Sequence, residues 1–164
     1  MTQHKLHKIV PHLWYNREAV EAARFYAGLF PDSRVDRVSS LPTESPSGPA
    51  GSVDIVEFTL FGQPFSAMSA GPHAEFNDAI SFMVHCATQA ELDKYWDTIE
   101  KHGGKPQACG WITDKYGVRW QIVPTVLLDM MSDPDKAKAG RAAKEMMNQV
   151  KFDIAKLEAA FNGR

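Results

Sequence analysis

The stretch PHLWYNREAVEAARFYAGLFPDS, residues 11–33, holds the first strand and the first helix that the sequence predicts. Residues 9–15 are rich in β-branched and aromatic side chains, which is typical of a strand. Asn16 is a favourable helix cap, and apolar residues recur at helical spacing over 18–30 until Pro31 ends the pattern. We therefore expect a strand followed directly by a helix.

Three further strands are expected after this helix. Residues 33–41 alternate weakly between apolar and polar side chains, residues 52–62 alternate clearly, and a turn at 62–64 leads into a short strand over 65–70. Residues 42–52 contain three prolines, two glycines and three serines, a composition that predicts a loop. The first part of the chain is therefore a βαβββ unit.

The same order of elements recurs in the second part of the chain. Residues 79–86 predict a strand, Thr88 begins a capping box for a helix over 89–102, and Gly103-Gly104 ends that helix. Residues 110–124 then predict two strands around a turn. Two similar halves at a spacing of roughly 70 residues, longer than a solenoid repeat, indicate a duplicated βαβββ module.

The predicted fold class is α+β, with helices after the duplicated core. Asp133-Pro134 predicts the start of a helix over 134–148, and Asp153 predicts the cap of a last short helix. We expect a core over residues 1–124, with module one at about 8–71 and module two at about 78–124, and a helical C-terminal extension over 125–164.

Composition and charge limit the possible partners. The chain has 164 residues, 44% of them hydrophobic, and a net charge of −2, which gives no strong field for nucleic acid or an anionic membrane. There is no signal-peptide pattern and no apolar run near the ~18 residues of a membrane span, so a cytoplasmic location is expected. Cys86 and Cys109 form no CxxC pair and are expected to be reduced thiols.

Several short segments are similar to a known family. They are Phe25-Tyr26, Leu29-Phe30, Gly71-Pro72, 79–82, 91–96, Gly103-Gly104, 109–114 and 120–124. With the duplicated βαβββ pattern, they resemble the vicinal-oxygen-chelate superfamily, which includes glyoxalase I, bleomycin-resistance proteins and extradiol dioxygenases. Within it, the chain resembles the PhnB-like branch labelled "3-demethylubiquinone-9 3-methyltransferase". The resemblance implies two βαβββ modules that form a curved mixed-sheet half-barrel, whose concave side encloses a cavity.

The resemblance also implies where a metal would bind. Metal-using members place His and Glu ligands on the first and last strands of each module, where a divalent ion can bind two substrate oxygens. The matching positions here are His12, Ala67 or Met68, Ala79 or Ile80, and Gln121. One imidazole and one amide do not make such a site, so we expect no metal.

The methyltransferase label implies S-adenosylmethionine. A Rossmann-type site for that cofactor needs a glycine-rich turn between a strand and a helix, whereas Gly103-Gly104 follows a helix. We expect no cofactor.

The cavity lining is predicted from strand parity and from the resemblance. Arg119 and Gln121 share a face that would bind a carboxylate or phosphoryl group, unless Arg119 pairs with an acid such as Asp114. Asp114 is predicted to form an Asx-type turn. The expected ligand-binding residues are His12, Trp14, Met68, Ser81, Met83, Trp111, Arg119 and Gln121.

Two of the assignments leave alternatives. His12 is a remnant metal ligand, a general base or a polar wall, or else a hydrogen-bonded interior residue. The loop 42–52 either covers the cavity mouth or is a solvated connection. The other histidines have no metal-ligand spacing and are expected to be surface or structural residues; they are His4, His7, His73, His85 and His102.

The leading functional hypothesis is a metal-free protein that binds a small organic ligand in an aromatic-lined cavity, for sequestration or resistance. One alternative is a lyase, isomerase or dioxygenase-like enzyme with an atypical metal site that includes His12 and Gln121. Another is a dimeric interaction protein without a ligand. No catalytic residue is assigned. A homodimer is expected, because the C-terminal extension carries a line of apolar residues.

Overall fold

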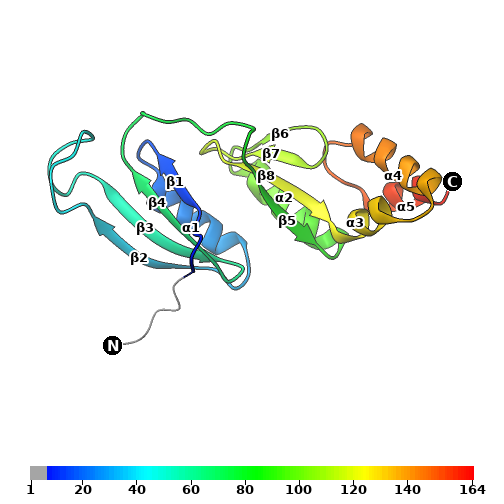
Figure 1. Ribbon diagram of the computed structural model, residues 1–164, viewed down its shortest axis with the longest axis horizontal. Coiled ribbons are helices and arrows are strands. Elements are labelled where there is room, and N and C mark those ends of the chain that lie inside the picture. Colours follow the sequence, from blue (N-terminus) through cyan, green and yellow to red (C-terminus); the bar gives the residue numbers. More distant parts are fainter. Residues whose placement is uncertain (1–6) are drawn as a thin grey trace. The chain divides into compact units, whose positions relative to one another are not determined.

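The computed structural model describes residues 7–164, and His4 lies outside that range. The chain divides into two compact units, one ending at Glu75 and one spanning Phe76–Arg164. Figure 1 shows that each unit contains a sheet with a helix packed against it. No helix among the described residues has the length and apolar character required to cross a lipid bilayer.

The first unit is a βαβββ module. Its sheet has the order β1-β4-β3-β2, in which β1 is parallel to β4 and the other neighbours are antiparallel. Its elements are β1 (His12–Tyr15), α1 (Ala19–Leu29), β2 (Arg34–Ser40), β3 (Asp54–Leu60) and β4 (Gln63–Ser69).

Helix α1 covers one face of this sheet. Tyr26 of α1 is buried against Phe58 of β3, and Phe58 stacks on Phe65 of β4 with ring centroids 5.3 Å apart. The predicted cap of α1 at Asn16 is wrong, because Glu18 is the N-cap residue and no side chain caps the helix. The carbonyl of Asn16 instead accepts a hydrogen bond from the N–H of Gly71, which holds the end of β1 beside the end of β4.

The second unit repeats this topology. Its sheet has the order β5-β8-β7-β6, and β5 is parallel to β8. Its elements are β5 (Phe82–Cys86), α2 (Gln89–Lys101), β6 (Lys105–Pro106), β7 (Trp111–Thr113) and β8 (Arg119–Pro124). The duplicated βαβββ pattern and the α+β class are therefore confirmed, with two open mixed sheets in residues 7–164.

Local signals in the second unit are also confirmed. The Thr88 side chain caps α2 by accepting from the N–H of Glu91, and Glu91 accepts from the N–H of Ala87. Asp114 is a turn former, since its Oδ1 accepts from the N–H groups of Tyr116 and Val118.

Three helices follow the second sheet. They are α3 (Thr125–Ser132), α4 (Lys136–Asn148) and α5 (Ile154–Phe161). Helix α3 is absent from the sequence prediction, and the cap of α4 is Asp135, not Asp133. Asp135 accepts from two N–H groups of α4, whereas Asp133, two residues earlier, accepts from the N–H of Asp135. Asp153 caps α5 as predicted.

The segment between α4 and α5 docks on module two. The N–H groups of Cys109 and Gly110 donate to the carbonyls of Gln149 and Val150, each at 2.8 Å. The Gln89 side chain of α2 donates to the carbonyl of Phe152 and accepts from the N–H of Ile154. Helices α3–α5 are consequently part of the second unit.

Candidate functional site

The face of each sheet opposite its helix carries a row of three side chains in register. In the first unit the row is Trp14, Met68 and Ile55, from β1, β4 and β3. The equivalent row of the second unit is Met83, Gln121 and Trp111, from β5, β8 and β7. We call these the first row and the second row. Predicted site residues occupy most of both rows.

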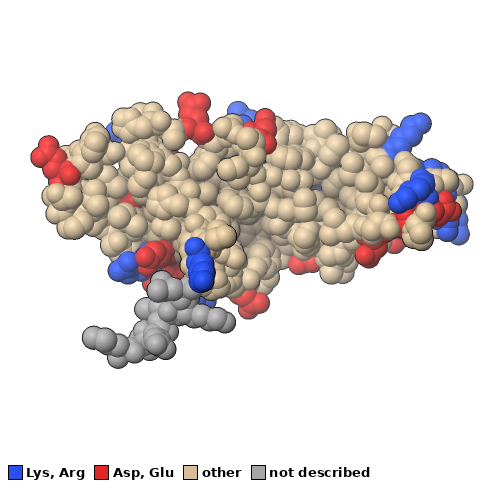
Figure 2. All heavy atoms as spheres, viewed as in Figure 1, with Lys and Arg blue, Asp and Glu red and all other residues tan. Residues whose placement is uncertain are grey.

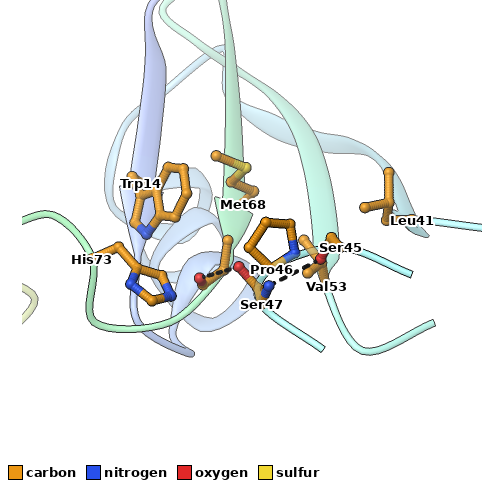
Figure 3. Close-up of a pocket in the computed structure, with 9 residues that line it drawn as sticks. Trp14, Leu41, Ser45, Pro46, Ser47, Val53, Met68 and His73 are labelled. Carbon is orange, nitrogen blue, oxygen red and sulfur yellow. Dashed lines mark hydrogen bonds between the residues drawn. The ribbon is translucent and has the colours of Figure 1, made fainter. Parts of the chain in front are cut away.

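A cavity of about 280 Å³ lies over Trp14 and Met68 of the first row. Trp14 and Met68 contribute its sheet wall, and the opposite wall comes from the loop between β2 and β3. Figure 3 shows the Trp14 and His73 rings on one side, Leu41 on the other, and Met68 and Pro46 between them. The full lining is Trp14, Leu41, Ser45, Pro46, Ser47, Val53, Met68, Ala70 and His73.

Hydrogen bonds hold the loop in place over the cavity. The Ser47 hydroxyl donates to the carbonyl of Ala70 at 2.6 Å, and the N–H of Ser47 donates to Ser45 Oγ at 3.2 Å (Figure 3). Leu41 bonds through its backbone to Val53 and Gly51. Of the two alternatives for residues 42–52, the structure therefore supports a loop that covers a cavity.

Trp14 is fixed by its own hydrogen bond. The indole Nε1–H donates to the carbonyl of Gly71 at 2.8 Å, so the polar edge of the ring is satisfied by the protein. His73 meets Trp14 edge-on, with ring centroids 6.2 Å apart and planes at 85°. The two rings give the cavity an aromatic corner.

His12 lies two residues before Trp14 on β1, so both side chains are on the same face of the sheet. Its Nδ1 is 3.1 Å from Ser66 Oγ, and the imidazole is exposed. His12 is thus a hydrogen-bonded surface residue outside the cavity lining, and the buried alternative for it is wrong.

Farther across the same sheet, Arg37 donates two hydrogen bonds to Glu57, at 2.8 and 2.9 Å.

Five predicted site residues belong to the second unit. Gln121 donates to Ser81 Oγ at 2.8 Å, beside Met83 and Trp111 in the second row. Arg119 donates through Nε to Asp78 and through its NH1 group to the carbonyls of Phe76 and Gly117. The acid that Arg119 pairs with is therefore Asp78, because Asp114 is engaged by its own turn and by Trp120.

Most residues that line the cavity were not predicted from the sequence. Trp14 and Met68 were predicted, whereas His73 was expected to be a surface or structural residue. Leu41 and Val53 line the cavity because they pair at the base of the loop, which brings both side chains to the open face. The available signals were the Pro-rich composition of 42–52 and the Gly71-Pro72 turn that follows β4.

Charge does not gather at the cavity. Figure 2 shows acidic and basic side chains interspersed on the face in view, with both signs over the C-terminal helices.

The buried thiol of Cys86 is not a nucleophile, because burial, reinforced by the charge of Glu91, raises its pKa to about 12.

The residues at the family's metal positions do not fit a divalent ion. His12 bonds to Ser66, Ala67 is a buried apolar residue, and the Gln121 amide bonds to Ser81. Within residues 7–164, no three His, Cys, Asp or Glu side chains come together as a metal site. That the protein works without a metal stays a prediction from the sequence.

Comparison with known proteins agrees with this fold and these motifs. The family model described as 3-demethylubiquinone-9 3-methyltransferase matches residues 7–123. The chain belongs to this family. The predicted PhnB-like resemblance is therefore confirmed, and the match ends at the last residues of β8, just before the C-terminal helices. No curated protein sequence matches the chain.

Several solved structures are similar to this chain. A PhnB protein from Bacillus cereus is 28% identical, with a TM-score of 0.63 over 72% of this chain and 99% of that chain. PA1353 from Pseudomonas aeruginosa is 20% identical, with a TM-score of 0.52 over 70% and 95%. The fosfomycin resistance protein FosX from Listeria monocytogenes is 12% identical, with a TM-score of 0.50 over 71% and 89%. The last two show the fold alone.

The family's description implies S-adenosylmethionine, and the strand-to-helix turns do not fit a Rossmann-type site for it. The turn from β1 to α1 is Asn16-Arg17-Glu18, and the turn from β5 to α2 is Ala87-Thr88. Neither contains the glycine that lets a backbone approach a cofactor closely.

Proposed function

We propose that the protein binds a small organic ligand in the cavity of its first unit, and that sequestration or resistance is the role of this binding. The observation that carries the proposal is the cavity itself, which hydrogen bonds within the protein hold open. Trp14 is fixed by Gly71 and the covering loop by Ser47, so little ordering is required when a ligand binds.

Size and polarity of the cavity define what fits. At about 280 Å³ it is slightly smaller than the sites of drug-sized ligands, which begin at roughly 300 Å³. Leu41, Pro46, Val53, Met68 and Ala70 give it a largely apolar wall. A flat molecule of one or two rings would bury its apolar surface here against Trp14.

We also make a proposal for the cellular location of the protein and one for its assembly. We propose a cytoplasmic location, because Cys86 and Cys109 are free cysteines, which is typical of a reducing compartment. We also propose a homodimer, because large apolar side chains are exposed on α3 and α4 and in the segment between α4 and α5, namely Leu128, Met131, Met147 and Val150. Native mass spectrometry of freshly purified protein tests the assembly by reporting a mass of two chains, and a single-chain mass would contradict it.

The binding proposal is tested with 2-naphthol as an uncharged two-ring probe. Calorimetry and thermal unfolding of the full chain are expected to show saturable binding and a raised melting temperature. Met68→Trp fills the cavity and is expected to weaken binding roughly ten-fold or more. Met83→Trp is the matched control, because Met83 is an exposed methionine of the second row outside the cavity lining.

A second variant protects the test against misfolding. Ser47→Ala removes the hydroxyl that donates to Ala70 and adds no bulk, so it is expected to loosen the loop and weaken 2-naphthol binding. Unchanged binding in both Met68→Trp and Ser47→Ala, or no binding by the wild-type protein, would contradict the proposed site.

A further inference from the structure

The polar groups of the cavity are unequally available to a ligand. Trp14 uses its single N–H on Gly71, and Ser47 uses its single O–H on Ala70. Ser45 Oγ accepts the N–H of Ser47, which occupies one of its lone pairs and leaves its own O–H as a donor. The backbone N–H groups of Ala70, Gly71 and His73 all donate within the protein. Most donors around the cavity are therefore already used.

His73 is different. Within residues 7–164, its ring nitrogens make no hydrogen bond, while the ring stays in place through its edge contact with Trp14. Its own N–H donates to the carbonyl of Gly71, so the backbone that carries the imidazole is fixed as well. The imidazole is exposed and lines the cavity, which places it at the mouth (Figure 3).

The charge of the lining favours one class of ligand. None of the lining residues described above is Asp or Glu, so a ligand anion meets no like charge there and a ligand cation finds no carboxylate. An imidazole N–H donates well to a carboxylate, and the bond is charge-assisted when the ring is protonated. At an exposed mouth the carboxylate also keeps part of its hydration, which lowers the desolvation penalty.

We propose that the ligand is an aromatic carboxylate, whose ring lies against Trp14 and Met68 and whose carboxylate binds the His73 imidazole at the cavity mouth. This inference rests on the proposed function of the same cavity. In it, His73 determines specificity and takes no part in holding the fold.

The test compares 2-naphthoate with 2-naphthamide, which has the same rings and a similar shape but no charge. Calorimetry on the wild-type chain is expected to show roughly ten-fold tighter binding of 2-naphthoate. His73→Leu is expected to remove this preference, and His73→Gln, which keeps an N–H donor, to retain part of it. His85→Gln is the matched control, because His85 is an exposed histidine outside the cavity lining.

The outcomes separate this inference from the proposed function. Equal affinity for the two probes, or a preference that survives in His73→Leu, overturns the role of His73 while the cavity remains the binding site. Failure of the wild-type chain to bind 2-naphthoate, 2-naphthamide and 2-naphthol overturns both. A preference lost in His73→Leu and kept in His85→Gln supports the inference.

Discussion

The two modules share one topology but use the same connection differently. The connection between the second and third strands of module one is residues 41–53, and that of module two is residues 107–110. The long connection covers the open face of its own sheet and lines a cavity. The short connection binds the segment that joins α4 to α5.

Backbone conformation explains what the short connection does. Cys109 and Gly110 both have positive φ, at 59° and 76°, so their consecutive N–H groups point to the carbonyls of Gln149 and Val150. The buried ring of Phe152 packs where a Cβ of Gly110 would be, since that atom would be 2.3 Å from Cε2 of Phe152. One module therefore accommodates part of its own chain, while the other leaves room for a ligand.

The connection, not the sheet, decides the role of each module. The first row and the second row occupy equivalent positions, each with one tryptophan, one methionine and a third side chain. A cavity is found over the first row, where the Pro-rich loop supplies the second wall. Substitutions in each connection test this difference.

The largest effect is expected from Gly110→Ala. The added methyl group would meet Phe152 and the carbonyl of Ile122, and alanine at a φ of 76° is strained. We expect the free energy of unfolding of the second unit to fall by about 3 kcal/mol. Hydrogen exchange measured by mass spectrometry would show faster exchange in the second unit and unchanged exchange in β1–β4.

Gly140→Ala is the control for that substitution. Gly140 lies inside α4 with open space around its Cα, so alanine is expected to stabilise the helix by up to about 1 kcal/mol. Equal destabilisation by both substitutions would contradict a specific role for the contact between Gly110 and Phe152.

Gly48→Ala makes the corresponding change in the long connection. Gly48 has a φ of 139°, and a Cβ there would lie 2.6 Å from Ser52 Oγ. We expect a smaller loss of about 1–2 kcal/mol, confined to the loop, and clearly weaker 2-naphthol binding. Gly51→Ala is the control, since Gly51 also has positive φ but has nothing within 4 Å of an added Cβ. Equal 2-naphthol binding by the wild-type protein, Gly48→Ala and Gly51→Ala would show that the loop does not shape the cavity.

Local patterns predicted the elements because they report on a single strand or helix. Alternation over 52–62 gave β3, and Thr88 with Glu91 gave the start of α2. Helix α3 was missed because it follows β8 directly, with Pro124 as its N-cap residue and no side-chain cap to mark its start. Patterns therefore fail where one element continues into the next.

The candidate site was predicted only where it lies on strands. Strand parity placed Trp14 on one face with His12, and the resemblance pointed to Met68; both Trp14 and Met68 line the cavity. His73 was missed because its place depends on how the chain turns after β4, which periodicity does not describe. Local patterns did not identify the acid that pairs with Arg119 for a similar reason, because Asp78 lies 41 residues away in sequence.

The smallest effect is expected from Lys151→Met, which tests the ion pairs between the docked segment and α2. Lys151 Nζ lies 2.7 Å from Asp93 and 2.9 Å from Asp97. Burial alone would lower the pKa of Lys151, but hydrogen bonds to the two carboxylates raise it, and the bond from Lys151 lowers the pKa of Asp93. Because all three groups are partly exposed, we expect a loss of at most about 1 kcal/mol in the free energy of unfolding of the second unit.

The direction of the pH dependence checks the cause of that loss. A carboxylate whose pKa is lowered by folding contributes stability above its unfolded value and loses it as the pH falls. The difference between wild type and Lys151→Met should therefore shrink in chemical denaturation as the pH drops below about 3.8, the ordinary pKa of Asp93. It should also shrink at high salt, which screens exposed pairs. Lys156→Ala is the control, because its pair with Asp153 is 3.9 Å long and exposed, so no measurable change is expected. A difference that persists at both low pH and high salt would mean that the Lys151 stem stabilises the docked segment by packing, and that the ion pairs do not.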